Sequence, residues 1–206
     1  MKKILFTGFE PFGGENINPS WEAVAALPAE IDGIQIVTAK IPVVFGKSAA
    51  VLLEILQREL PCAVICVGQA GGRVAITIER VAINCDDASI DDNEGNRPID
   101  EMIARDGPDA YFATLPIKAM VDNLRQNGIP AAVSNSAGTY VCNHVMYAAL
   151  HYAATRKLPL AAGFVHIPYL PSQVVDKAAS PSMSLEMLTA GLVTMAKTLK
   201  TERGVK

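Results

Sequence analysis

Cys142 has the residue type and the setting of a catalytic nucleophile. A polar stretch, residues 134–140, separates a segment predicted as a strand from one predicted as a helix, and Cys142 follows it. With Thr139 as the N-cap, Cys142 lies in the first helical turn, where unpaired N–H groups and the helix dipole favour an anion. We therefore expect a lowered thiol pKa, a nucleophilic sulfur, and N–H groups able to stabilise an oxyanion. The alternative is a structural cysteine that begins an apolar helix face continued by Val145, Met146 and Ala149.

A cysteine nucleophile needs a base, and the geometry of the predicted helix separates the three histidines. His144 and His151 follow Cys142 at spacings that point them to other sides of the same helix. His166 instead ends the apolar segment 160–165, and in open α/β sheets functional groups gather at the carboxyl ends of strands. We expect His166 to be the base. The alternative is a core histidine bonded to the backbone.

Glu79 is the residue that we expect to orient His166. It lies in the mostly apolar segment 75–84, where a carboxylate is costly to bury unless it is paired. Its neighbour Arg80 projects to the opposite face of an extended strand. A carboxylate that orients an imidazole and stabilises the imidazolium would complete a catalytic triad. The alternative is an ion pair with Arg73 or another cation.

The elements that must position these residues alternate between strand and helix patterns. Apolar or β-branched runs predict extended segments at residues 3–7, 34–41, 63–67, 73–84, 131–134 and 160–166. Helical spacing of apolar residues predicts helices at 19–27, capped by Asn18, and at 47–60, 115–127, 140–154 and 184–200. Strands that are apolar throughout predict a mainly parallel twisted sheet with helices on both faces. We expect one α/β domain of three layers, α/β/α, over residues 1–206.

Residues 85–110 depart from this alternation. They hold 9 of the 21 acidic residues of the chain, with turn signals at 92–95 and 106–108. A calcium loop of the EF-hand type does not fit, because Ile90 occupies the position of the first acidic ligand. We predict a solvated loop excursion.

Composition excludes several classes of protein. The chain has 206 residues, 50% of them hydrophobic, and a net charge of −3, which is incompatible with disorder. It has no basic block to bind nucleic acid or an anionic membrane, and no charge-free stretch of the ~20 residues that span a bilayer. The N-terminal segment lacks the features of a signal peptide, and four cysteines are too few for a disulfide scaffold, so we expect a cytoplasmic protein. Three scattered histidines do not form a zinc set, and we expect no metal or cofactor.

The candidate residues share an expected location. Residues 8–14, 68–72 and 134–138 each follow a predicted strand, and His166 ends another. If these strands are parallel, all four segments open on one rim of the sheet and form a pocket. Phe9, Phe12 and Tyr140 would line it with aromatic rings, unless the two phenylalanines only anchor a loop in the core. Asn18 and Gln69 would add neutral amides, a combination that suits an uncharged polar ring.

The sequence resembles the pyroglutamyl peptidase I family of cysteine peptidases over nearly its whole length. The similarity is dense at residues 7–14, 18–22, 68–72, 76–84, 92–95, 136–143 and 166–171. The resemblance implies removal of an N-terminal 5-oxoproline from small peptides by a Cys-His-Glu triad through an acyl-enzyme. It thereby assigns Cys142 as nucleophile, His166 as base and Glu79 as its orienter.

The resemblance also implies which residues hold the substrate and how the chain assembles. The residues at positions that grip the pyroglutamyl ring are Phe9, Phe12, Asn18, Gln69, Tyr140 and Val141. A homotetramer, built as a dimer of dimers, is implied as well. Ser89 departs from the family pattern, because it replaces an arginine near the site, and we expect this to affect substrate positioning or turnover.

Two other functions stay open at this point. A small-molecule binding module would keep the pocket and have no use for Cys142 as a nucleophile. A thiol redox sensor would need a second cysteine close to Cys142, chosen from Cys62, Cys66 and Cys85.

Overall fold

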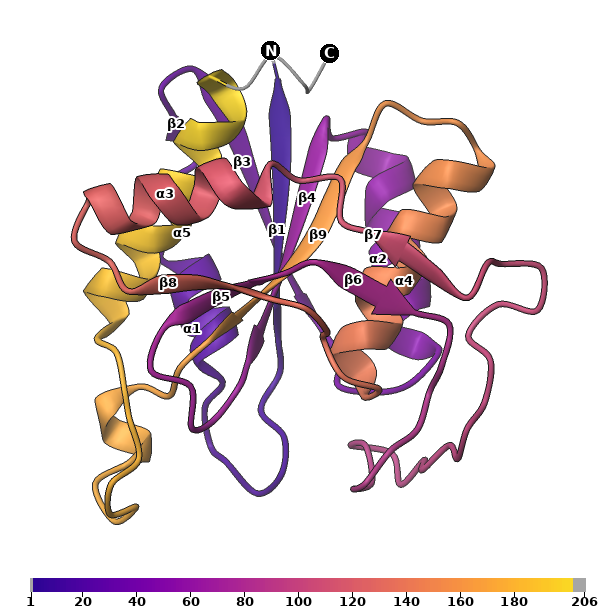
Figure 1. Ribbon diagram of the computed structural model, residues 1–206, viewed down its shortest axis with the longest axis horizontal. Coiled ribbons are helices and arrows are strands. Elements are labelled where there is room, and N and C mark those ends of the chain that lie inside the picture. Colours follow the sequence, from indigo (N-terminus) through magenta and orange to yellow (C-terminus); the bar gives the residue numbers. More distant parts are fainter. Residues whose placement is uncertain (1, 202–206) are drawn as a thin grey trace.

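A seven-stranded sheet forms the centre of the computed structural model, which describes residues 2–201. The strands lie in the order β2-β3-β1-β4-β9-β5-β8 (Figure 1). Their bounds are β1 Lys3–Phe9, β2 Glu30–Ile31, β3 Ile34–Ile41, β4 Ala63–Gln69, β5 Ile76–Glu79, β8 Ala131–Ser134 and β9 Ala161–Ile167. A separate antiparallel pair is made by β6, Val81–Ile83, and β7, Ala110–Phe112.

Strand direction changes at β5. The four strands β3, β1, β4 and β9 run parallel, in the register that pairs Gly68 with His166. β5 is antiparallel to β9, with Thr77 opposite His166, and parallel to β8, with Glu79 opposite Ser134. Thr77 and Glu79 are two residues apart on one strand, so their side chains share one face of β5. Because Thr77 pairs with His166, Glu79 is on the same face one step beyond that pair. In Figure 1, β5 and β8 lie at a steep angle to β1 and β4.

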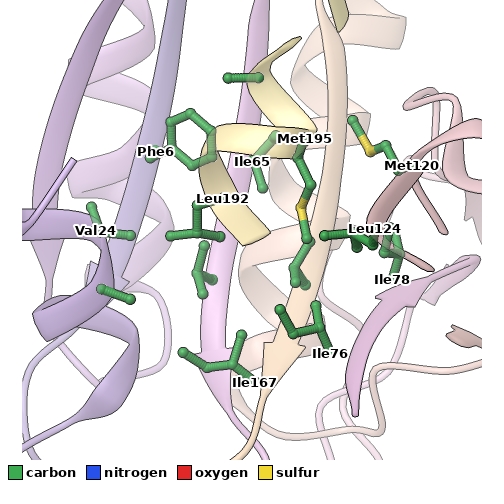
Figure 2. Packing of buried hydrophobic residues seen from close by; sticks show 14 of the residues in the cluster. Phe6, Val24, Ile65, Ile76, Ile78, Met120, Leu124, Ile167, Leu192 and Met195 are labelled. Carbon is green, nitrogen blue, oxygen red and sulfur yellow. The ribbon is translucent and has the colours of Figure 1, made fainter. Parts of the chain in front are cut away.

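Helices cover both faces of the sheet. One face carries α1, Pro19–Ala25, α3, Ile117–Gln126, and α5, Leu185–Thr201, and the other carries α2, Lys47–Glu59, and α4, Val141–Thr155 (Figure 1). Figure 2 shows the core on the first face, where Leu192 and Met195 of α5 pack near Phe6 and Ile65 of the sheet. Burial of these side chains stabilises each by ~1.5–3 kcal/mol relative to exposure. The fold class predicted from the sequence, a mainly parallel α/β/α sandwich, is confirmed.

Most predicted elements are present, and their ends differ by a few residues. Asn18 caps α1 as expected, since its Oδ1 accepts the Ser20 N–H at 3.0 Å. The prediction of one extended stretch over 73–84 is wrong, because the chain changes partners at Arg80. The Arg80 N–H donates to Ser134, but the Arg80 carbonyl accepts from Ala113 beside β7. The short strands β2 and β7 and the 3₁₀ turn Pro171–Gln173 were not predicted.

Residues 85–110 are more tightly held than a solvated excursion. Asp86 and Asp92 are buried, and Asp92 accepts the backbone N–H groups of Phe45, Glu94 and Asn96 at 2.9 Å each. The bond from Phe45 docks this segment on the loop that precedes α2, and the other two hold the turn at residues 92–96. Within residues 2–201, no helix is long and apolar enough to cross a membrane.

Candidate active site

Cys142 lies in the first turn of α4, as expected, but Thr139 does not cap the helix. The N-cap is Tyr140, whose side chain makes no capping hydrogen bond, and the Thr139 hydroxyl donates to the Asp87 carbonyl at 2.7 Å instead. The prediction of Thr139 as the cap is therefore wrong by one residue. The first N–H groups of a helix have no acceptor within it, so those of Val141, Cys142 and Asn143 are available to an oxyanion.

The Cys142 sulfur lies against Gly68 of β4, the residue paired with His166. A Cβ on Gly68 would come within 3.0 Å of Cys142 Sγ and 2.7 Å of the Phe164 ring, so the absence of a side chain makes room for the sulfur. The expectation of a lowered thiol pKa is wrong. Burial, followed by the negative charge of Glu79, raises the pKa of Cys142 to about 12. Desolvation in this apolar corner outweighs the helix dipole and the charge of Arg73, which favour the thiolate.

His166 is bonded to the predicted carboxylate. Its Nδ1 lies 2.7 Å from Glu79 Oε1, and both side chains are buried. Burial lowers the pKa of His166, although Glu79 opposes this effect. Burial alone would raise the pKa of Glu79, but hydrogen bonding and charge from His166, with smaller effects of Ser134 and Arg73, leave that pKa below its usual range. At neutral pH the imidazole is therefore neutral, with its proton on Nδ1 and its Nε2 lone pair free.

Glu79 also accepts a hydrogen bond from Arg73, whose Nη1 lies 2.7 Å from the same Oε1 atom. The two partners considered for Glu79 from the sequence are thus both present. Arg73 Nη1 also donates to the Thr77 hydroxyl.

Cys142 and His166 line one small pocket of about 160 Å³. The expectation that four parallel strands end on its rim is correct for β1, β4 and β9 only. β8 runs antiparallel to β9, and the loop after it reaches the pocket by leading into α4. No hydrogen bond between Cys142 and His166 is found within residues 2–201, and such contacts often tighten only when substrate binds. The lining consists of Phe9, Phe12, Asn18, Val43, Gln69, Ala137, Tyr140, Val141, Cys142 and His166.

The pocket includes all six residues expected to hold a substrate, but two of them also have structural roles. Phe9 is buried and packs against Phe164, so it lines the pocket and anchors its loop in the core. Both ends of the Asn18 amide are engaged, because Nδ2 donates to the Glu10 carbonyl at 2.9 Å and Oδ1 caps α1. Val43 also lines the pocket, and no sequence pattern indicated it, since its loop carries no signal beyond the end of a strand.

The Gln69 amide is oriented by Gln173, a residue that no sequence pattern indicated. The Leu170 N–H donates to Gln173 Oε1 at 3.0 Å, which fixes Nε2 as the other end of the Gln173 amide. That Nε2 donates to Gln69 Oε1 at 2.9 Å and also faces the Glu15 carboxylate. Gln69 must therefore keep its oxygen toward Gln173. Its NH₂ group is then left to donate to a ligand in the pocket that Gln69 lines.

The other two histidines are in different surroundings, as helix geometry predicted. His144 Nδ1 lies 2.7 Å from Asp86, and its Nε2 accepts the Gly46 N–H at 3.0 Å. His151 contacts Tyr111 at 3.0 Å. Ser89 is exposed, and it does not line the pocket.

Comparison with known proteins identifies the family of the chain. A family model described as "Pyroglutamyl peptidase" matches residues 2–202. The chain belongs to the pyroglutamyl peptidase family. It is 55% identical to a pyrrolidone-carboxylate peptidase of Alkaliphilus oremlandii, over 99% of this chain and 96% of that protein. A pyrrolidone-carboxylate peptidase of Thermosipho africanus is 56% identical over 97% of this chain and 98% of its own length.

Solved structures of the family share the fold. The crystal structure of pyroglutamyl peptidase I from Bacillus amyloliquefaciens is similar with a TM-score of 0.93 and 51% identity, covering 98% of each chain. A mutant pyrrolidone carboxyl peptidase from Pyrococcus furiosus is similar with a TM-score of 0.92 and 47% identity, over 95% of this chain and 97% of that one.

Proposed function

We propose that this chain is a cysteine exopeptidase that removes N-terminal 5-oxoproline from small peptides, with Cys142 as nucleophile, His166 as base and Glu79 as its orienter. The observation that carries the proposal is the 2.7 Å bond from His166 Nδ1 to Glu79, in a histidine that lines the same small pocket as Cys142. Membership of the pyroglutamyl peptidase family supports the reaction.

The proposed cycle needs only the residues of this site. His166 Nε2 takes the thiol proton as Cys142 Sγ attacks the carbonyl carbon that follows the ring, and N–H groups at the start of α4 hold the oxyanion. The imidazolium then gives its proton to the leaving amine, so the peptide bond breaks and a thioester forms. Water, deprotonated by His166, attacks the thioester, and the products are 5-oxoproline and the regenerated thiol.

The raised pKa of Cys142 determines how the thiolate nucleophile forms. With the thiol pKa at about 12 and the pKa of His166 lowered, the resting pair is neutral. The thiolate therefore forms by transfer of a proton to His166, and Glu79 stabilises the imidazolium that results. In this respect the chemistry differs from that of a cysteine held permanently as an anion.

The pocket chemistry suits a lactam. A volume of about 160 Å³ with aromatic walls fits one small ring, and the NH₂ group of Gln69 is a donor for the ring carbonyl. A buried donor without an acceptor costs ~1–3 kcal/mol, so a prolyl group, which lacks the ring carbonyl, should bind poorly. The exposed Ser89 is outside this set of contacts.

A fluorogenic amide assay tests the proposal. We expect cleavage of the pyroglutamyl amide, little cleavage of the matching prolyl amide, and loss of activity in Cys142→Ala but not in Cys62→Ser. Equal cleavage of both amides, or full activity of Cys142→Ala, would contradict it. A binding module would instead bind 5-oxoproline with unchanged affinity in Cys142→Ala and cleave neither amide.

A further inference from the structure

Glu79 Oε1 receives two donors at the same distance. His166 Nδ1 and Arg73 Nη1 each lie 2.7 Å from it. The proposed triad explains the first contact and has no role for the second. Arg73 belongs to the loop after β4, and its side chain is 31% exposed, whereas Glu79 is fully buried. A partly exposed cation thus contacts a buried carboxylate that already has a partner.

Thr77 fixes Arg73 in this place. The Arg73 guanidinium donates to the Thr77 hydroxyl through the same Nη1 atom. That hydroxyl also lies 3.4 Å from the His166 carbonyl, and Thr77 is the residue opposite His166 in the register of β5 and β9. Arg73, Thr77, Glu79 and His166 therefore form a closed ring of contacts, with the guanidinium and the imidazole on one carboxylate oxygen.

We propose that Arg73 is a positioning residue of the catalytic site: by sharing Glu79 Oε1 with His166, it weakens the pull of the carboxylate on the imidazolium and keeps His166 available as a base. The inference rests on the proposed function, because it concerns the base of that reaction. A buried carboxylate with imidazole as its single partner forms a strong ion pair, and that pair holds the proton on the ring. A second cation at the same oxygen opposes this protonation.

The charges around His166 support this role. Glu79 on β5 favours the imidazolium, and Arg73 on the neighbouring loop disfavours it. Cys142 on α4, Cys66 on β4 and Tyr140, which lines the same pocket, are titratable groups nearby. Burial raises the pKa of each to about 12, so all three are uncharged at neutral pH. Arg73 is thus the cation that balances Glu79, and it also favours the Cys142 thiolate.

The pH profile of kcat/KM separates this role from a structural one. In Arg73→Met we expect the acid limb to move to higher pH by about one unit, with lower kcat at pH 7, a KM within about twofold, and recovery of activity at higher pH. Arg73→Lys restores the charge, and its acid limb should stay close to that of the wild type. The rate of Cys142 alkylation by iodoacetamide should show the same shift in Arg73→Met, and it requires no substrate.

The outcomes are distinct. Unchanged acid limbs in Arg73→Met, for both turnover and alkylation, would overturn the inference, as would a rise in KM alone. If Arg73→Met does not fold, Arg73→Gln and Thr77→Val take its place, and unchanged limbs in both would overturn it. A wild-type protein that does not cleave the pyroglutamyl amide refutes the proposed function instead, while the alkylation profile still tests Arg73.

Discussion

His166 donates its Nδ1–H to Glu79 Oε1 over 2.7 Å, although 87 positions of the sequence separate the two residues. Antiparallel pairing of β5 with β9 brings them together, because Thr77 stands opposite His166 and Glu79 follows on the same face. The bond fixes the tautomer of the base and places a negative charge behind the imidazolium that forms during catalysis.

Replacement of Glu79 by glutamine should therefore reduce kcat by about 100- to 10,000-fold, because the amide can accept the Nδ1–H but cannot stabilise the imidazolium. Steady-state kinetics on the pyroglutamyl amide measure this loss. The control is Glu59→Gln, which removes an ion pair with Lys3 far from the site and should leave kcat unchanged. A kcat within threefold of the wild type in Glu79→Gln would contradict the assignment.

The pH dependence follows from the directions of two pKa shifts. Burial lowers the pKa of His166 from 6.5, so the acid limb of kcat/KM should lie below pH 6.5, with full activity at pH 7. The Cys142 thiol has a pKa of about 12, so its own ionisation should add no limb between pH 7 and that value. Alkylation rates that show Cys142 itself ionising close to neutral pH would contradict this. The resting enzyme would then hold a thiolate beside an imidazolium, as the position of Cys142 at the start of a helix suggests.

The same groups link pH to folding. His166 and Glu79 both bind protons more weakly in the folded chain than in the unfolded one, since both pKa values are lowered. The unfolded state then takes up more protons, and the free energy of unfolding should decrease as pH falls below 6.5. Denaturant titrations at several pH values test this, and a rise in stability on acidification from pH 6.5 would be inconsistent with it.

Gly68 should tolerate no side chain. An alanine Cβ would lie 2.7 Å from the Phe164 ring and 3.0 Å from Cys142 Sγ, and we expect a cost of ~1–3 kcal/mol in stability. Displacement of the sulfur should lower kcat/KM by about 100-fold. Gly163→Ala on β9 is the matched control, because its Cβ meets the end of the Leu115 side chain, so stability should fall while activity is kept. Equal activities of the two variants would refute this account of Gly68.

Gln173 should control the KM for pyroglutamyl substrates without touching them. In Gln173→Leu, Gln69 loses its orienting donor, and KM should rise by about tenfold. In Gln173→Glu, the new carboxylate accepts from the Gln69 amide and turns its oxygen toward the pocket, so KM should rise further. Gln126→Glu, at the exposed end of α3, should leave KM unchanged. The idea fails if Gln173→Glu binds substrate as well as Gln173→Leu or better.

Sequence patterns predicted the sheet, the helices and the three residues of the proposed triad, because these depend on periodicity and on where strands end. They did not predict the reversal of β5 and β8, since strand direction depends on long-range pairing that short apolar runs do not encode. The thiol pKa was predicted with the wrong sign. Its local cause, the helix terminus, is visible in the sequence, whereas the burial that outweighs it is a tertiary property.

The orientation of the Gln69 amide could not be predicted from the sequence for a similar reason. It depends on the Leu170 N–H and on Gln173, which lies 104 positions away along the chain. The homotetramer stays a prediction from the family resemblance, and the cytoplasmic location stays a prediction from the cysteine content and the N-terminal segment.

A crystal structure with the aldehyde analogue of 5-oxoproline would show whether Cys142 is the nucleophile, because an aldehyde reacts with the nucleophile and mimics the tetrahedral intermediate. We predict a covalent bond from Cys142 Sγ to the aldehyde carbon, the ring carbonyl at the Gln69 NH₂ group, and the new oxygen at the first N–H groups of α4. A ring bound with no bond to Cys142, or seated outside the pocket of Phe9, Tyr140 and His166, would contradict it.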